Sequence, residues 1–179
     1  MSSFLPAAGE PSVSLYVRGA AEDAKLKERL EGRTRGIPVV IPCAAAVRAL
    51  IALSATRLAL VSPPWFSAEM DQQGARYFQS QGFEVVHTGP VGLPSDQQAI
   101  QPGELYDWIR TQTPKSAQAV FVGGNGLRAI GVIKALEENL DRPILTANQV
   151  AFWQALALSG SREPIVGYGR IFGVRPPAS

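Results

Sequence analysis

The stretch Ala119-Val120-Phe121-Val122-Gly123-Gly124-Asn125-Gly126 joins a short apolar run to a glycine-rich turn. Four consecutive apolar residues are typical of a parallel strand that is buried on both faces. A turn after such a strand lies at the carboxyl end of the sheet, where open α/β folds bind their ligands. This stretch therefore predicts an α/β protein and a first place to look for a binding site.

Similar apolar runs occur on both sides of this stretch, and residues with helical spacing follow each of them. The predicted strands are residues 13–17, 38–41, 58–61, 83–87, 119–122 and 143–146. The clearest predicted helix lies between Ser67, a suitable N-cap, and Gly82, a suitable left-handed stop. Further helical spacing begins at Glu104, Leu127 and Asn148. Alternation of strand and helix predicts a parallel sheet covered by helices.

Composition excludes several classes of protein. The chain has 179 residues, of which 17 are basic and 15 acidic, and the basic residues form no cluster, so no nucleic-acid partner is expected. Arg48 interrupts the best apolar run, and the N-terminus does not resemble a secretory signal, so a cytoplasmic protein without membrane contact is expected. Cys43 is the only cysteine, which excludes an internal disulfide. No metal-ligand spacing is present, and no metal is expected.

The glycine-rich turn has more than one interpretation. Gly123, Gly124, Asn125 and Gly126 could cradle a carboxylate or phosphate, because glycines allow close backbone approach and a helix is predicted to follow. The alternative is a tight turn whose glycines serve packing alone. The turn also fits the dinucleotide pattern G-x-G-x-x-A. The next predicted strand, however, ends without the acidic residue that would hold a ribose, so nicotinamide binding is disfavoured.

Isolated residues also carry candidate chemistry. Cys43 lies at a predicted helix start, where a thiol can be activated, but a lone cysteine is more often a small buried residue. His87, the only histidine, ends a predicted strand. It could act as a general base, but a strand-end histidine that faces solvent is the more common case. Trp65 could form the apolar wall of a pocket or pack on its own helix. Ser12 and Ser14 could bond a carboxylate or satisfy local backbone groups.

Four segments resemble the aspartate/glutamate racemase and maleate isomerase superfamily. They are Val13-Ser14-Leu15-Tyr16-Val17-Arg18-Gly19-Ala20-Ala21, then Gly36-Ile37-Pro38-Val39-Val40 with Ala44-Ala45-Ala46-Val47-Arg48-Ala49-Leu50, then residues 122–133, and Gly167-Tyr168-Gly169-Arg170-Ile171-Phe172. The last segment resembles the closing motif of arylmalonate decarboxylases. Together the segments span most of residues 11–173 in the order that the family has.

The resemblance implies two similar α/β/α halves of flavodoxin-like type, with parallel sheets and a site between the halves. It also implies cofactor-independent chemistry on a small carboxylic acid. In racemases and maleate isomerases of this superfamily, one cysteine comes from each half, whereas a single cysteine protonates an enediolate in arylmalonate decarboxylases. Backbone N–H groups and hydroxyls hold the substrate carboxylate, which such chemistry requires.

This sequence departs from the family pattern at the positions that carry the chemistry. Pro11 and Gly124 stand where the resemblance places the two cysteines, and Pro64 stands where many members carry a hydroxyl. Neither proline nor glycine has a side chain that transfers a proton. Tyr16, His87 and Cys43 remain as candidates for an acid or base.

The resemblance also predicts the organisation of the chain. Residues 1–54 with 161–179 would be a remnant of the first half, and residues 55–160 would be the second half. The opening portion of the first half has no counterpart in this sequence. An incomplete first half would expose a sheet edge, so a homo-oligomer or another covering chain is conceivable.

Two functional hypotheses follow. The first is an isomerase-like or racemase-like protein, similar to maleate isomerase or arylmalonate decarboxylase, that acts on or binds a small carboxylic acid. Gly123, Gly124 and Gly126 would form the cradle, and Trp65 an apolar wall. The polar contacts would be Ser12, Ser14, Asn125 and Thr146. The alternative is a vestigial, non-catalytic carboxylate-binding domain.

Overall fold

The structure is a computed structural model, and it describes residues 19–161 and 163–177. Within these residues, four strands form one parallel sheet in the order β2-β1-β3-β4. The strands are β1 (Arg57–Ser62), β2 (Glu84–Pro90), β3 (Ala119–Val122) and β4 (Ile144–Thr146). The helices are α1 (Gly19–Arg33), α2 (Pro42–Ala52), α3 (Ala68–Ser80), α4 (Pro102–Gln112), α5 (Ile133–Leu140), α6 (Ala147–Leu158) and the 3-10 helix η2 (Arg170–Gly173).

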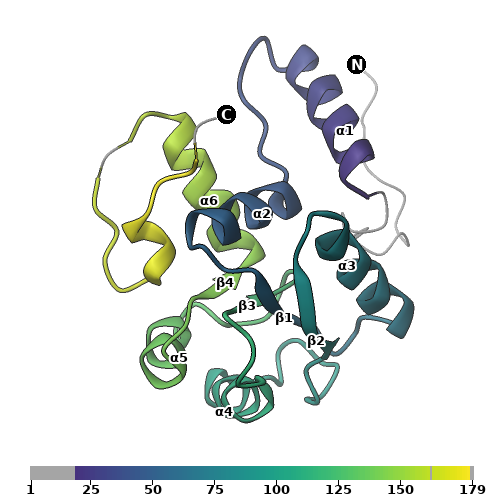
Figure 1. Ribbon diagram of the computed structural model, residues 1–179, viewed down its shortest axis with the longest axis vertical. Helices are drawn as coiled ribbons and strands as arrows, with labels where there is room; N and C mark the ends of the chain where they lie inside the picture. Colours follow the sequence, from purple (N-terminus) through teal and green to yellow (C-terminus); the bar gives the residue numbers. More distant parts are fainter. Residues whose placement is uncertain (1–18, 162, 178–179) are drawn as a thin grey trace.

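Helices cover both faces of the sheet, as the alternating sequence pattern predicts. α2, α3 and α6 lie on one face, and α4 and α5 lie on the other (Figure 1). Along β1, Leu58 and Leu60 pack toward the first group, whereas Ala59 and Val61 pack toward the second. This two-sided burial explains why the strands read as continuous apolar runs.

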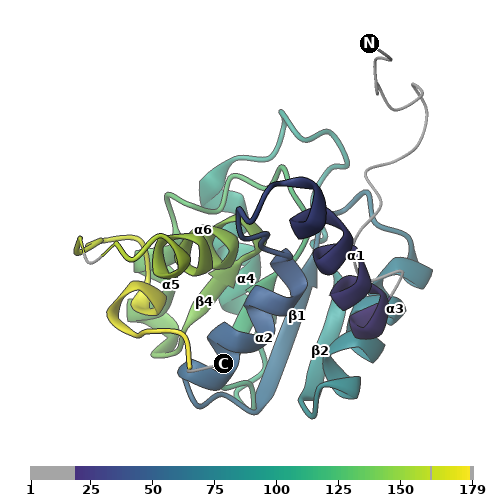
Figure 2. The ribbon, with the colours of Figure 1, turned by 90° about the horizontal axis from the view of Figure 1, so that it is seen from above.

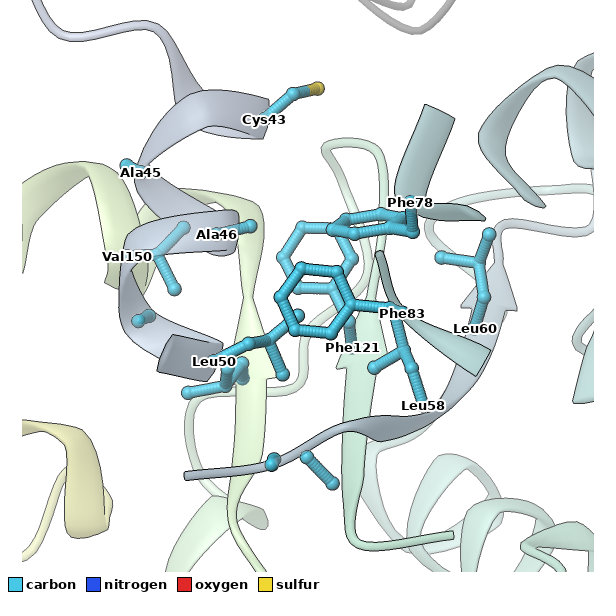
Figure 3. Packing of buried hydrophobic residues seen from close by; sticks show 14 of the residues in the cluster. Cys43, Ala45, Ala46, Leu50, Leu58, Leu60, Phe78, Phe83, Phe121 and Val150 are labelled. Atoms are coloured by element: carbon cyan, nitrogen blue, oxygen red, sulfur yellow. The ribbon is translucent and has the colours of Figure 1, made fainter. Parts of the chain in front are cut away.

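The core on the α2, α3 and α6 face is built around aromatic rings. Phe78 of α3 makes edge contacts with Phe121 of β3 and Phe83, at centroid distances of 5.3 and 6.3 Å. These rings lie together beside Leu58 and Leu60 (Figure 3). α2 packs its small residues Ala46 and Ala49 into this cluster, which allows the helix to lie close to its neighbours.

α1 lies beside α3 in both ribbon views (Figures 1 and 2). The buried side chain of α1 is Asp23, which faces Tyr77 of α3. Burial raises the pKa of Asp23, and the Tyr77 hydroxyl lowers it by a smaller amount. Because α1 is attached through this buried carboxyl, its attachment depends on the protonation of Asp23.

The predicted helix between Ser67 and Gly82 is confirmed. The Ser67 hydroxyl accepts the N–H of Met70 at 3.3 Å, and Gly82 has a φ of +88°. The predicted strands at residues 58–61, 83–87, 119–122 and 143–146 correspond to β1, β2, β3 and β4. The predicted strand at 13–17 lies outside the described residues.

Two predicted elements are wrong. Residues 38–41 form no strand; they lead into α2, whose first residue is Pro42. Ile41 has extended backbone angles of φ −98° and ψ 118°, so the local conformation matches the pattern although no strand of the described residues pairs with it. The helix predicted from Leu127 begins at Ile133 instead, after an irregular loop.

Candidate functional site

A cavity of about 620 Å³ lies at the carboxyl ends of β3 and β4. Its walls come from the loop after β3, the first half of α6 and the segment that follows α6. Most of the lining side chains are apolar, and none of them carries a charge. The lining residues are Val122, Gly124, Gly126, Leu127, Ala129, Ile130, Thr146, Asn148, Gln149, Phe152, Ile165, Tyr168 and Phe172.

Apolar side chains stand unusually exposed around this cavity. Ile130, Phe152 and Tyr168 are each more than half exposed, at 54%, 53% and 51%. The Phe152 ring makes an edge contact with Phe172 at a centroid distance of 6.2 Å. Exposed apolar side chains around a cavity are typical of ligand-binding grooves and also of surfaces that contact another protein.

The glycine-rich loop adopts a different geometry from the predicted cradle. The Gly123 N–H donates to the carbonyl oxygen of Val61 at 2.8 Å, so the sheet already uses this group. Gly124 and Gly126 have positive φ angles of +69° and +98° and reach the cavity. Asn125 is exposed and does not line it. Because the next helix of the described chain starts only at Ile133, no helix dipole points from this loop into the site.

A different helix N-terminus reaches the cavity. α6 begins directly after β4, and Thr146, Asn148 and Gln149 at its start all line the cavity. The Thr146 hydroxyl accepts the Gln149 N–H at 3.2 Å, and the Gln149 side chain accepts the Thr146 N–H at 3.0 Å. This capping box fixes the helix start. It leaves the hydroxyl hydrogen of Thr146 and the first N–H groups of α6 able to meet an anion.

Gly124 is closely packed against Pro63 and Phe66, two residues that do not line the cavity. A Cβ atom at this position would stand 2.6 Å from Cγ of Pro63 and 3.0 Å from Cζ of Phe66. Pro63 follows β1 directly, so this contact lies where β1 and β3 end side by side. A side chain at residue 124 therefore has no room unless Pro63 moves.

The remaining sequence candidates lie away from the cavity. Trp65 is half-buried and packs against the core on the α4 and α5 face. Cys43 is buried in the first turn of α2; burial raises the pKa of its thiol far above the ordinary value, and Asp23 raises it further. Neither side chain lines the cavity. Pro11, Ser12, Ser14 and Tyr16 lie outside the described residues.

The sequence favoured a His87 that faces solvent at the end of a strand, and the structure places it differently. It lies within β2, half-buried, with its ring 6.2 Å from the Trp108 ring. Its Nε2 atom is buried and has no hydrogen-bond partner within the described part of the chain. Burial lowers the pKa of His87, which keeps the ring neutral. The ring lies beside Trp108 and does not line the cavity, so it is not placed to serve the cavity as a base.

Sequence reasoning missed most of the cavity walls. Leu127 and Ile130 fitted a helical stripe, and Phe152 lay within the helix predicted from Asn148. Ile165 had no pattern at all. Tyr168 and Phe172 lay in a motif that resemblance singled out, and that motif was the available signal.

The segment after α6 is held by buried polar side chains. Glu137 of α5 accepts the N–H of Ile144 at 3.0 Å and the N–H of Arg170 at 2.8 Å. Burial raises the pKa of Glu137, and these backbone hydrogen bonds lower it in part. The Gln149 side chain donates to the carbonyl oxygen of Tyr168. These contacts bring Tyr168 and Phe172 to the cavity.

The described residues contain neither a metal cluster nor a membrane helix. Within residues 19–161 and 163–177, no group of three or more His, Cys, Asp or Glu side chains could hold a metal ion. None of the helices in these residues is long and apolar enough to cross a bilayer.

The parallel sheet with helices on both faces, and a cavity at the carboxyl ends of its strands, define an α/β protein of the flavodoxin-like type. The family model for arylmalonate decarboxylase matches residues 9–172. The chain belongs to the arylmalonate decarboxylase family.

Individual proteins are also similar to this chain in sequence or in fold. The arylmalonate decarboxylase of Bordetella bronchiseptica is 24% identical over 166 residues, which cover 90% of this chain and 68% of the relative. A crystal structure of arylmalonate decarboxylase superposes with a TM-score of 0.79 at 22% identity, covering 87% of this chain and 69% of the other. The maleate cis-trans isomerase of Nocardia farcinica has the same TM-score at 18% identity, with 88% and 66% covered.

Proposed function

We propose that this protein binds a small carboxylic acid with an apolar, preferably aromatic, substituent in the cavity between the loop after β3 and α6. The observation that carries the proposal is the combination of apolar walls with the N-terminus of α6 in one cavity. The walls would hold the substituent, and the Thr146 hydroxyl and first N–H groups of α6 would receive the carboxylate.

The size of the cavity supports an acid larger than maleate. A volume of about 620 Å³ lies in the usual range for drug-sized ligands and leaves room for a ring as well as a carboxylate. Uncharged walls disfavour an amino acid such as aspartate, whose ammonium group would be buried without a partner. The maleate isomerase of Pseudomonas putida S16 has been crystallised with maleate, which makes maleate a useful comparison ligand.

The proposal concerns binding without thiol chemistry. Pro11 and Gly124 stand where the resemblance places the family cysteines, and Cys43 is buried away from the cavity. The described lining residues include neither a cysteine nor a histidine, and neither an aspartate nor a glutamate. A thiol that protonates an enediolate therefore has no counterpart among them.

Turnover is a second candidate function, favoured by the match of the family model over residues 9–172. The reaction would be decarboxylation of an arylmalonate. Phenylmalonate would lose CO2 by cleavage of a carbon–carbon bond, and a proton would then add to the resulting enediolate to give phenylacetate. The phenol of Tyr168 is the acidic group that lines the cavity. Formation of phenylacetate, followed by NMR and abolished in Tyr168→Phe, would establish this second function.

Binding can be tested by thermal shift and calorimetry with phenylacetate, phenylmalonate, maleate and the neutral methyl phenylacetate. Selective binding raises the melting temperature by mass action. We expect the aromatic acids to raise it more than either maleate or the ester does. If none of the acids shifts a sample that melts cooperatively, the proposed function is wrong.

A matched pair of variants locates the site. Ile130→Asp places a negative charge at the cavity, whereas Ile51→Asp places one at an equally exposed residue of α2, since the two side chains are 54% and 53% exposed. We expect the first variant to lose phenylacetate binding and the second to keep it. Equal affinities of the two variants for phenylacetate would show that the ligand binds elsewhere on the protein.

A further inference from the structure

The motif Gly167-Tyr168-Gly169-Arg170-Ile171-Phe172 contributes two side chains to the wall of the cavity, Tyr168 and Phe172. We name residues 165–172 the clasp, because this segment follows α6 in the chain and is hydrogen-bonded to Gln149 of α6 and Glu137 of α5. Ile165, Tyr168 and Phe172 of the clasp form one wall of the cavity. Ile171 is fully buried in the core and anchors its end.

Backbone groups of the clasp are bound by side chains from the body of the protein. The Glu137 carboxylate receives the Arg170 N–H with both oxygens, at 2.8 and 3.1 Å, and also receives the Ile144 N–H from β4. The Arg170 guanidinium in turn donates to the Glu137 carbonyl at 3.1 Å and to Asp141 at 2.8 Å. One buried carboxylate therefore ties the clasp to both α5 and the sheet.

Gln149 provides a second attachment that reaches the cavity directly. Its side-chain oxygen accepts the Thr146 N–H, and its side-chain nitrogen donates to the Tyr168 carbonyl. Gln149 also lines the cavity and is only 4% exposed. The residue that caps α6 thus also fixes the position of the Tyr168 backbone.

The glycines of the motif permit this close approach. Gly169 has a φ of +104°, and a Cβ atom there would lie 2.5 Å from Nε2 of Gln149 and 3.4 Å from Oε1 of Glu137. Gly167 also has a positive φ, of +88°, but a Cβ atom there would meet nothing within 4 Å. Only Gly169 is therefore required by contact as well as by backbone conformation.

We propose that Glu137 and Gln149 are positioning residues that hold the clasp as a wall of the ligand cavity, so that clasp order and ligand occupancy depend on each other. The identity of the acid ligand rests on the proposed function. The attachment of the clasp by Glu137 and Gln149 does not depend on which ligand binds. Coupling of this kind between a segment and a ligand commonly changes affinity by roughly 5- to 150-fold.

Hydrogen exchange of residues 165–173, read by mass spectrometry, tests the attachment without any ligand. In Glu137→Ala we expect this segment to exchange at least about tenfold faster than in the wild type. Glu138→Gln is the matched control, because Glu138 lies next along α5 but is exposed and pairs with Lys134. Glu137→Gln should be intermediate, since its amide oxygen still accepts one N–H. Exchange in Glu137→Ala equal to that in Glu138→Gln overturns the proposal.

Calorimetry with phenylacetate, and with toluene as a neutral probe, tests the coupling. We expect Glu137→Ala to weaken binding of the probe by about tenfold and Glu138→Gln to leave it unchanged. Saturating probe should slow exchange of the clasp in the wild type. If toluene binds but no acid does, the proposed function is wrong, and the affinity of the variants for toluene still tests the coupling. If neither probe binds, or if Glu137→Ala binds the probe as tightly as Glu138→Gln does, this inference is wrong.

A second pair of variants guards against a Glu137→Ala protein that does not fold. Gly169→Ala and Gly167→Ala both strain a positive φ, but only the first displaces Gln149. We expect Gly169→Ala to bind the probe more weakly than Gly167→Ala. Equal affinities would contradict the role of Gln149. The wild-type exchange experiment, with and without probe, requires no variant.

Discussion

Gly124 and Pro63 are in such close contact that a Cβ atom on the glycine would lie 2.6 Å from Cγ of the proline. The contact joins the ends of β1 and β3, the two central strands of the sheet. It means that the residue at the position where the resemblance places a family cysteine is fixed by packing and by backbone conformation at once.

Gly124→Ala should therefore destabilise the protein through both effects. Gly160→Ala is the matched control, because Gly160 has a similar φ of +75° with nothing within 4 Å of a built Cβ. We expect Gly124→Ala to lose about 1–3 kcal/mol more than the control, which is the usual cost of overpacking. Urea denaturation measures the difference. Adding Pro63→Ala should recover part of it, and equal losses at the two glycines would refute the packing explanation.

Cys43 should be inert in the folded protein. Its side chain is buried, and burial raises the pKa of the thiol, so the reactive thiolate is scarce. We expect labelling by a disulfide reagent at pH 8 to be at least about a hundredfold slower in the native protein than in urea. Cys43→Ser supplies the background rate. Rapid labelling of the native protein would show that α2 opens readily.

Asp23 should make the protein less stable as pH rises. Burial raises its folded-state pKa above the ordinary value of 3.8. The folded state thus holds the proton more tightly than the unfolded state, and the resulting stability is complete below pH 3.8. It is lost as pH rises through the raised pKa.

Asp23→Asn removes this dependence, because an amide stays neutral at every pH. Its stability relative to the wild type should increase between pH 4 and pH 7, as measured by urea denaturation at several pH values. Glu28→Gln, at an exposed position of the same helix, should show no such trend. A wild-type protein that gains stability relative to Asp23→Asn over this range would contradict the direction of the pKa shift.

Thr146 should prove important for stability as well as for binding. Its hydroxyl caps α6, and loss of such a cap costs about 1 kcal/mol. Thr146→Ala should show this loss in urea denaturation, whereas Thr146→Ser should keep both the cap and phenylacetate binding. If Thr146→Ala were destabilised but bound phenylacetate as tightly as Thr146→Ser, the hydroxyl would be a cap alone.

The sequence alone was sufficient to predict the four described strands and α3, because these elements depend on local patterns. Continuous apolar runs identified β1 and β3, and the hydroxyl of Ser67 identified a helix start. The start of α5 could not be predicted in the same way. Leu127 and Ile130 have helical spacing with Ile133, but their side chains turn to the cavity, and the loop before Ile133 stays irregular.

The candidate site was less predictable, because a cavity depends on which surfaces the fold leaves uncovered. Gly124, Gly126 and Thr146 could be selected because they lie at or just after the carboxyl ends of strands, and all three line the cavity. Phe152 is half exposed there because no element among the described residues covers that part of α6. The contact between Glu137 and the Arg170 backbone joins residues far apart in sequence, and a carboxylate on a helix gives no local sign of such a partner.

Every described lining residue of the cavity lies between Val122 and Phe172, in one continuous part of the chain that starts at the end of β3. Under the proposed function, a single cassette, residues 122–172, carries the loop after β3, the start of α6 and the clasp together. Exchanging that cassette between members of the family should transplant ligand preference in one step, while β1, β2 and the aromatic core remain those of the recipient.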